Sequence, residues 1–354
     1  MKTSVQVLLI ALSAVLGSVV TYVLTAHRNS VKPSAIVNSS IPVVTVSNAC
    51  DYDIVRQDGF KYIRPVQFIV RSKESAEFLP LKTNLQIVID SCTRIGLIER
   101  ASVYFRDFDR GHWMAINPDE EYHPGSLMKL PLMLTYLKMA EQHEGLLEMQ
   151  LMNKFNPKSQ PAQFYTSESI RDGEKYSIRE LLSRMIRYSD NIATTLLLKH
   201  VDKSKYLKLF EDLNMDKPDL MDVNFTISPK EYATFLTSVY NGSYLTKEYS
   251  DFAVELMAGC DFEKGFAAGL PDSTPIAHKF GEWSDGKSIA QLHEAGIIYI
   301  NGNAYELVVM TDGDRLQDLP MVISAIASAA YNTLDDPQLP DTTFPEVDYY
   351  SENR

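Results

Sequence analysis

Apolar residues recur at helical spacing in some parts of the chain and alternate with polar ones in others. Residues 81–96 repeat apolar positions every three or four residues, which predicts a helix. Residues 101–108 alternate instead, which predicts a strand that can pair with 113–116 through an intervening turn. The amino-terminal part of this region therefore predicts a helix followed by a hairpin.

The same pattern continues through the rest of the chain. A long helical block is predicted from Ser126 to about His200, with breaks near 156–157 and 172–173. Residues 295–300 and 305–310 predict a second hairpin around Asn301-Gly302, and 320–332 predicts a closing amphipathic helix. Strand pair, helical block, strands and terminal helix make an α+β layout.

The two ends differ from this layout. Residues 5–26 form an apolar run long enough to cross a bilayer core of roughly 30 Å, so residues 1–28 are predicted to be a transmembrane anchor or signal segment. We expect an uncleaved anchor rather than cleavage near Ala26. Residues 29–80 predict a tether and a small extension with an apolar run at 67–71, and the acidic residues 335–354 predict a disordered tail.

Composition narrows the functional classes. The net charge of −12 over 354 residues argues against nucleic acid as a partner, because phosphates require a basic footprint. The three cysteines and seven histidines show no metal-site spacing, so we expect no metal and no cofactor. Cys92 is predicted to be a core residue, and His123, His278 and His293 are predicted to be structural hydrogen-bonding groups.

Candidate chemistry begins with Ser126-Leu-Met-Lys129. A serine three residues before a lysine shares one helix face with it, one turn apart. A serine hydroxyl needs a nearby base to become a nucleophile, and a lysine whose pKa is lowered by apolar surroundings can be that base. The tetrad alone is a weak signal, because it arises by chance in many helices.

Two later segments strengthen it. Ser189-Asp190-Asn191 follows about sixty residues later, and Lys279-Phe280-Gly281 about ninety residues after that. Ser-x-x-Lys, Ser-Asp-Asn and Lys-Thr-Gly, in this order, are the signature of class A β-lactamases and penicillin-binding proteins. The chain therefore resembles the class A β-lactamase-like serine hydrolases over about residues 81–334.

The resemblance implies a fold and a set of roles. The family fold is an antiparallel sheet flanked by terminal helices beside an all-helical lobe, with the site between them. Ser126 is expected to attack a carbonyl and Lys129 to take its proton, although precedent leaves the base in dispute between the lysine and a glutamate. Ser189 would relay a proton to the leaving nitrogen, steered by Lys279, and Asn191 would bind the substrate amide. The backbone N–H groups of Ser126 and Glu282 would form the oxyanion hole.

The Lys279 strand departs from the family pattern at two positions. The family usually has Thr or Ser where Phe280 stands, but strand alternation lets Lys279 and Gly281 face the site while Phe280 points away. We expect Gly281 to leave room for substrate. The carboxylate of Glu282 puts in doubt the binding of substrates that carry a carboxylate nearby, because like charges repel.

A third departure concerns release of the acyl group. In the family, a glutamate in a Glu-x-x-x-Asn pattern activates the water that releases the acyl group, and this pattern is absent from residues 213–229. The segment contains Asp216, Asp219 and Asp222, but their spacing marks none of them as a replacement base. The expected function is hydrolysis of a β-lactam or a related cell-wall amide through an acyl-Ser126 enzyme. A D,D-peptidase-like peptidoglycan enzyme with slow deacylation and a non-turnover β-lactam or peptidoglycan binding or sensing module are the alternatives. The resemblance places the domain at the extracytoplasmic face of the membrane.

Overall fold

The computed structural model describes only part of the chain in detail. The predicted anchor, most of the predicted tether and the predicted tail from residue 336 onward lie outside the described residues. Among the helices that the structure does describe, none is long and apolar enough to cross a membrane. The described residues are 52–57, 66–154, 163–165, 167–218 and 225–335.

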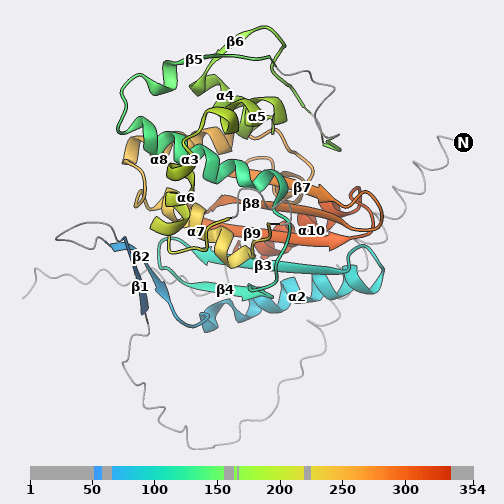
Figure 1. Cartoon of the computed structure of the whole chain (residues 1–354). Coiled ribbons are helices and arrows are strands. Elements are labelled where there is room, and N and C mark those ends of the chain that lie inside the picture. Colours follow the sequence, from blue (N-terminus) through green and yellow to red (C-terminus); the bar gives the residue numbers. More distant parts are fainter. Residues whose placement is uncertain (1–51, 58–65, 155–162, 166, 219–224, 336–354) are drawn as a thin grey trace, which may run out of the picture. The chain divides into compact units, whose positions relative to one another are not determined.

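A five-stranded antiparallel sheet has the strand order β4-β3-β9-β8-β7 (Figure 1). Both predicted hairpins are present, and the second is longer than predicted because pairing continues past the apolar runs to residues 290 and 313. The strands are β3 (Arg100–Asp107), β4 (Trp113–Ile116), β7 (Ile276–Ser284), β8 (Ala290–Ile300) and β9 (Asn303–Gly313).

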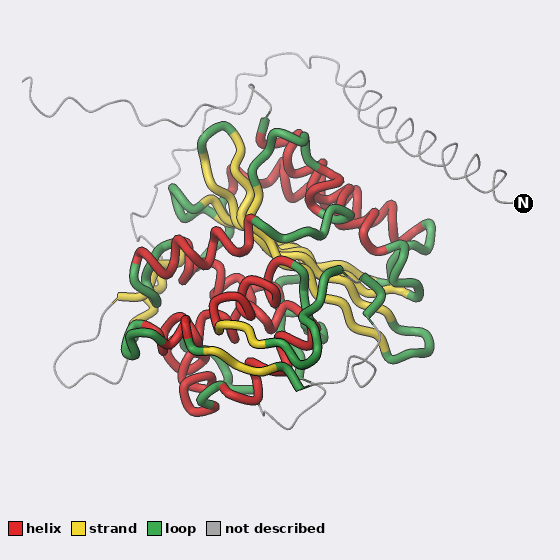
Figure 2. The backbone as a smooth tube through the Cα atoms, turned by 90° about the horizontal axis from the view of Figure 1, so that it is seen from above, coloured by secondary structure: helices red, strands yellow, loops and turns green. Residues whose placement is uncertain are grey.

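Alternate residues of each strand point to opposite faces of the sheet. On β9, Leu307 and Val309 pack with the terminal helices α2 (Leu79–Arg94) and α10 (Leu319–Leu334). Val308 and Met310 belong instead to the core of the helical lobe. The sheet therefore lies between two apolar cores, with helices along both of its faces (Figure 2). This confirms the predicted α+β fold of a sheet flanked by terminal helices beside a helical lobe.

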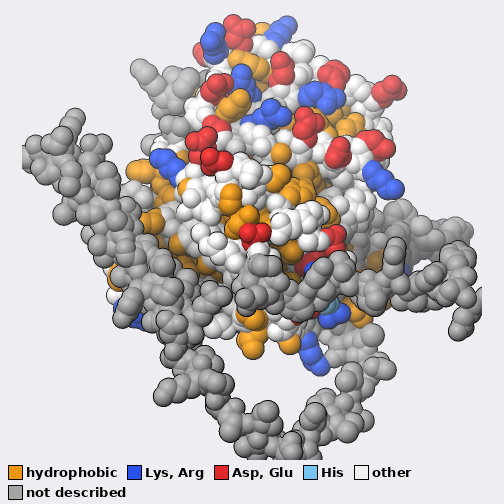
Figure 3. All heavy atoms as spheres, turned by 180° about the vertical axis from the view of Figure 1, so that it is seen from behind, with side chains coloured by type: hydrophobic (Ala, Val, Ile, Leu, Met, Phe, Trp, Pro, Cys, Tyr) orange, Lys and Arg blue, Asp and Glu red, His pale blue; other side chains and the backbone are white. Residues whose placement is uncertain are grey.

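The helical lobe is built by capped, amphipathic helices. Ser177 and Ser228 each form a capping box with the glutamate three residues later, which satisfies backbone donors at the starts of α4 and α7. Acidic and basic side chains are interspersed over the lobe surface in Figure 3. The lobe helices are α3 (Lys129–Ala140), α4 (Ile178–Arg187), α5 (Asn191–His200), α6 (Lys203–Asp212), α7 (Pro229–Tyr240) and α8 (Lys247–Ala258).

The predicted helical block from Ser126 to His200 was wrong in one part. Between α3 and α4 the chain forms a short 3-10 turn (Leu146–Glu148) and a two-stranded antiparallel sheet. Its strands are β5 (Gln150–Met152) and β6 (Lys175–Ser177), which pair across more than twenty residues. Three-residue strands carry too little alternation to be recognised, and their pairing depends on contacts distant in sequence.

The segment that precedes α2 is also ordered by pairing. The predicted apolar run at 67–71 lies in β2 (Val66–Arg71), which pairs with β1 (Tyr52–Arg56). A 3-10 turn (Ala76–Phe78) then leads into α2. Trp113 Nε1 of β4 donates a hydrogen bond of 2.7 Å to the carbonyl of Arg71. This part of the predicted extension is therefore bonded to the edge of the main sheet.

Candidate active site

Ser126 lies on a 3-10 turn, η2 (Gly125–Met128), and Lys129 is the first residue of α3. Side chains three residues apart are eclipsed in a 3-10 turn, so the predicted common face of Ser126 and Lys129 is kept. Gly125 has a φ of +52°, and a Cβ there would lie 2.2 Å from the carbonyl oxygen of Glu282. Glycine is therefore required at the residue before the serine, both for its backbone angle and for the approach of β7.

Gly281 of β7 also packs against the turn that carries Ser126. A Cβ on Gly281 would lie 2.3 Å from the carbonyl oxygen of Pro124 and 2.7 Å from the backbone nitrogen of Leu127. The sequence interpretation gave this glycine the task of leaving room for substrate. That role stays a prediction, and the structure adds a second requirement for glycine, because the backbone on either side of Ser126 leaves no space for a Cβ. The position of Ser126 relative to the sheet therefore depends on Gly281.

The ammonium group of Lys129 is held by the Ser-Asp-Asn loop. Its Nζ donates to the carbonyl oxygen of Ser189 at 2.5 Å, to Ser189 Oγ at 2.9 Å and to Asn191 Oδ1 at 2.8 Å. Only 3% of the Lys129 surface is exposed. Within the described residues no hydrogen bond joins Ser126 Oγ to Lys129. Catalytic hydrogen bonds often form only once substrate is bound, so this geometry keeps Lys129 as a candidate base.

Burial makes the neutral form of Lys129 accessible. Desolvation lowers its pKa well below the usual value, the nearby charge of Lys279 lowers it further, and Asp190 and Glu282 oppose the shift. Burial also lowers the pKa of Lys279, to about 8, against the opposing charges of Cys260, Asp261, Glu294 and Glu282. The loss of a proton from Lys129 leaves it able to accept the proton of a serine hydroxyl.

The loop that carries Ser189 and Asn191 is fixed by Asp190. Its carboxylate accepts the backbone N–H groups of Ile192 and Ala193 as the N-cap of α5. The same carboxylate accepts Ser169 Oγ at 2.9 Å and the Ile170 N–H at 2.8 Å. Asp190 therefore orders the loop that carries Ser189 and Asn191. Ser189 itself has a φ of +52°, a strained angle of the kind found at functional sites.

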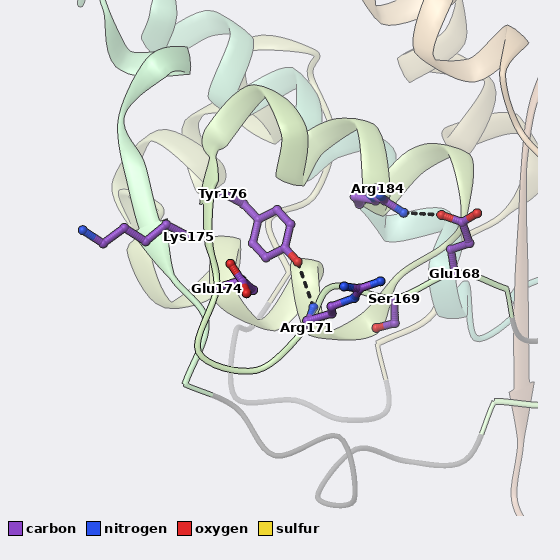
Figure 4. A pocket seen from close by; sticks show the side chains of 7 residues that line it. All are labelled: Glu168, Ser169, Arg171, Glu174, Lys175, Tyr176 and Arg184. Atoms are coloured by element: carbon purple, nitrogen blue, oxygen red, sulfur yellow. Dashed lines mark hydrogen bonds and ion pairs between the residues drawn. The ribbon is translucent and has the colours of Figure 1, made fainter.

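The segment bonded to Asp190 also borders an open pocket of about 630 Å³. Arg184 pairs with Glu168 there, and the Arg171 N–H donates to the hydroxyl of Tyr176 (Figure 4). Charges of both signs line this pocket. Its lining residues are Glu168, Ser169, Arg171, Glu174, Lys175, Tyr176 and Arg184.

Glu282 makes contacts that the sequence did not predict. Its carboxylate accepts the backbone N–H of Phe164 at 2.6 Å and that of Tyr165 at 3.1 Å. Gln163 Nε2 donates to the carbonyl oxygen of Ser189 at 3.3 Å. Burial raises the pKa of Glu282, while the two N–H donors, Lys129 and Lys279 lower it. Residues 163–165 therefore lie beside the site, although no motif or spacing marks them in the sequence.

Phe280 packs as strand alternation predicted. It is 2% exposed and belongs to the core shared with the terminal helices, and its ring stacks on Phe262 with centroids 4.2 Å apart. Lys279 Nζ donates to the carbonyl oxygen of Phe280 at 2.9 Å. At this position of β7 an apolar ring in the core therefore stands where the family usually has a hydroxyl.

Two of the three histidines near the motifs, His278 and His293, form hydrogen bonds through their rings. His293 is fully buried, where desolvation lowers its pKa to about 3, so its neutral ring donates from Nε2 to the carbonyl of His123 and accepts the Thr311 N–H at Nδ1. His278 Nδ1 lies 2.6 Å from Glu294 Oε1. Cys92 is buried in the core with the terminal helices. His278, His293 and Cys92 therefore have the structural roles that were predicted. The prediction was wrong for the ring of His123, which stacks on Trp283 with centroids 3.9 Å apart and whose buried Nδ1 has no hydrogen-bond partner among the described residues.

The α+β fold brings the segments of Ser126, Ser189 and Lys279 together, as the resemblance to the class A β-lactamase-like group implies. The model of the β-lactamase enzyme family matches residues 88–334, which is well over half of the chain. The protein belongs to this β-lactamase enzyme family, and it is class A β-lactamase-like.

Individual relatives are distant. The β-lactamase ROB-1 of Haemophilus influenzae is 28% identical over 164 residues, which are 42% of this chain and 51% of the relative. ROB-1 of Mannheimia haemolytica matches to the same extent, so the chain spans about half the length of these curated relatives.

Solved structures share the fold. A β-lactamase from Chitinophaga pinensis has a TM-score of 0.62 at 20% identity, covering 72% of this chain and 99% of its own. A PBP-A mutant, solved as an acyl-enzyme complex with penicillin G, has a TM-score of 0.58 at 21% identity, covering 72% and 97%.

Proposed function

We propose that the protein is a serine hydrolase that forms an acyl-Ser126 enzyme with a β-lactam or a related cell-wall amide. The observation that carries the proposal is the buried Nζ of Lys129, held by Ser189 and Asn191 one turn from Ser126. In the proposed reaction Ser126 Oγ bonds to the acyl carbon and the amide C–N bond breaks. The serine proton passes to Lys129 and then through Ser189 to the leaving nitrogen.

The remaining predicted residues have supporting roles in this proposal. Asn191 binds the substrate amide, the positive charge of Lys279 steers the proton relay, and Gly281 positions the turn that carries Ser126. The N–H groups of Ser126 and Glu282 stabilise the oxyanion. We further propose that residues 1–28 anchor the chain with its domain outside the cytoplasm. Retention of the full chain in the membrane fraction after alkaline extraction tests the anchor, and its release would contradict it.

The test of acylation is an intact-mass time course of the full chain, in mild detergent, with penicillin G. We expect an adduct of the mass of penicillin on Ser126 that is absent from Ser126→Ala. Because Ser189→Ala keeps the nucleophile but removes the relay, it should be acylated more slowly. If Ser126→Ala is labelled as fast as the natural chain, Ser126 is not the nucleophile and the proposal is wrong.

A D,D-peptidase with slow deacylation is the second candidate. It is favoured by the connection between α6 and α7, which contains no glutamate and whose described aspartate, Asp216, is exposed. Loss of a positioned base slows such a step by around 10²–10⁴. An adduct that clears in seconds supports a β-lactamase. A lasting adduct together with D-alanine release from a muramyl pentapeptide supports the peptidase, and a lasting adduct without release supports a binding or sensing module.

A further inference from the structure

An aromatic pocket of about 260 Å³ lies beside the candidate active site. Its rings form a connected cluster: Tyr165 meets Phe262 edge-on with centroids 5.2 Å apart, and Phe262 stacks on Phe280 at 4.2 Å. Phe164 packs edge-on against Tyr165 at 4.9 Å, yet it remains 56% exposed. The lining residues are Phe164, Tyr165, Ser167, Tyr188, Asp261, Phe262, Glu263, Lys264 and Phe280.

Three elements of the proposed site contribute walls to this pocket. Tyr188 immediately precedes Ser189, and Phe280 immediately follows Lys279. The third wall, Phe164 and Tyr165, is held by the Glu282 carboxylate through two backbone N–H groups. Lys279 Nζ lies 4.1 Å from the centroid of the Phe280 ring, so this wall of the pocket is in contact with the Lys279 side chain.

The size and lining of the pocket indicate what it can hold. A cavity of about 150 Å³ lined by apolar side chains is enough to bind benzene, so this pocket has room for one six-membered ring. Aromatic walls favour an aromatic guest through edge-on and offset contacts. The charged residues Asp261, Glu263 and Lys264 belong to the same lining, so the pocket combines apolar walls with polar groups.

We infer that this pocket binds an aromatic substituent on the leaving group of the acyl donor. The inference rests on the proposed function, in which Ser189 delivers a proton to the leaving atom and therefore lies next to the leaving group. Glu282 acts here as a positioning residue, because its carboxylate holds the backbone of the wall formed by Phe164 and Tyr165. The site thus selects substrates by the structure of their leaving group.

The test compares two ester donors with the full chain. N-acetyl-D-alanyl-D-lactate and N-acetyl-D-alanyl-D-phenyllactate share the acyl group and the carboxylate and differ only by a phenyl ring. In both reactions the Ser126 Oγ–acyl bond forms, the ester C–O bond breaks and the serine proton ends on the leaving oxygen. Because both donors leave the same acyl group on Ser126, a difference in kcat/KM reports on acylation alone.

We expect kcat/KM to be roughly tenfold higher for the phenyllactate ester, the scale expected when one ring is partly buried. Phe164→Ala should reduce the ratio towards one, since it removes an exposed ring and keeps the backbone N–H that Glu282 accepts. Met149→Ala is the matched control, because Met149 is 47% exposed and does not line the pocket. It should keep the ratio.

Each contrary result overturns a defined statement. Equal kcat/KM values for two donors that both acylate Ser126 overturn the pocket assignment and leave the proposed function standing. A preference that persists unchanged in Phe164→Ala overturns the pocket assignment as well. If neither donor nor penicillin G acylates Ser126, the proposed function and the pocket assignment are both wrong.

Discussion

Replacing Gly281 with alanine tests whether β7 positions the nucleophile. The added Cβ would lie 2.3 Å from the carbonyl oxygen of Pro124, whereas ordinary contact begins near 3.4 Å, so the two segments must separate by about 1 Å. Its other close neighbour, the backbone nitrogen of Leu127, is no easier to displace, because neither atom can move away by a change of rotamer. The backbone of Gly281 is not left-handed, so the variant tests steric contact and not chain conformation.

Two magnitudes follow from this separation. Overpacking of this kind costs about 1–3 kcal/mol of unfolding free energy. A displacement of about 1 Å in the reacting geometry lowers a catalytic rate by about 10²-fold. Gly281→Ala should therefore remain folded at low temperature but acylate Ser126 about a hundred times more slowly than the natural chain.

Gly269→Ala is the matched control. Its Cβ would lie 2.1 Å from the carbonyl oxygen of Ser324, at the contact between the short helix α9 (Phe266–Gly269) and α10. The clash is again with backbone, but it lies among the terminal helices. We expect Gly269→Ala to lose stability to a similar extent and to keep its acylation rate.

The assay combines thermal unfolding with the rate of penicillin G adduct formation by intact mass, measured at least 15 °C below the Tm of each variant. Comparing the acylation rates of the variants at equal folded fraction separates an effect of lower stability from an effect of a displaced Ser126. Acylation of folded Gly281→Ala at the natural rate would refute the reasoning that this contact positions Ser126. An equal loss of rate in Gly269→Ala would show that general destabilisation is the cause.

Two further predictions concern charge. Lys279→Gln removes a positive charge that lowers the pKa of Lys129. The pKa of Lys129 should therefore rise, and the acidic limb of the pH–rate profile for acylation should move to higher pH. An unchanged acidic limb in stopped-flow measurements would show that the charge of Lys279 does not affect Lys129. Burial raises the pKa of Glu306 from 4.5 to about 7 in the folded state. Between these two pH values the folded state binds more protons than the unfolded state does. The free energy of unfolding therefore falls as pH rises, by about 3 kcal/mol over this range. In Glu306→Gln this decline should be absent from denaturant titrations, and its persistence would assign it to other groups.

Several features of the site could be predicted because they depend on residues close together in sequence. The alternation of β7 placed Phe280 opposite Lys279, and the core position of Phe280 confirms it. Asp190 directly precedes an apolar helical run, a local pattern that fits a helix N-cap, and its bonds to Ile192 and Ala193 show that it caps α5. The spacing of Ser126 and Lys129 likewise places both side chains on one face of a single turn.

Other features depend on contacts between distant segments. The short strands β5 and β6 interrupt a block predicted as helical, because their pairing joins residues more than twenty positions apart. The bond from Phe164 to Glu282 spans 118 positions, and no local pattern of residue types records it. The aromatic pocket could not be predicted for the same reason, because its walls come from four segments that are separate in the sequence.

The sequence by itself determined the family, the order of the three motifs and the α+β arrangement, because these follow from residue identity and short-range periodicity. Only the tertiary structure decided how the motifs act on one another. Three features depend on packing: the burial that lowers the pKa of Lys129, the contact of Gly281 with the turn that carries Ser126, and the hydrogen bonds between Glu282 and residues 163–165. Desolvation and steric contact are properties of neighbours in space, and those neighbours are set by the folded chain.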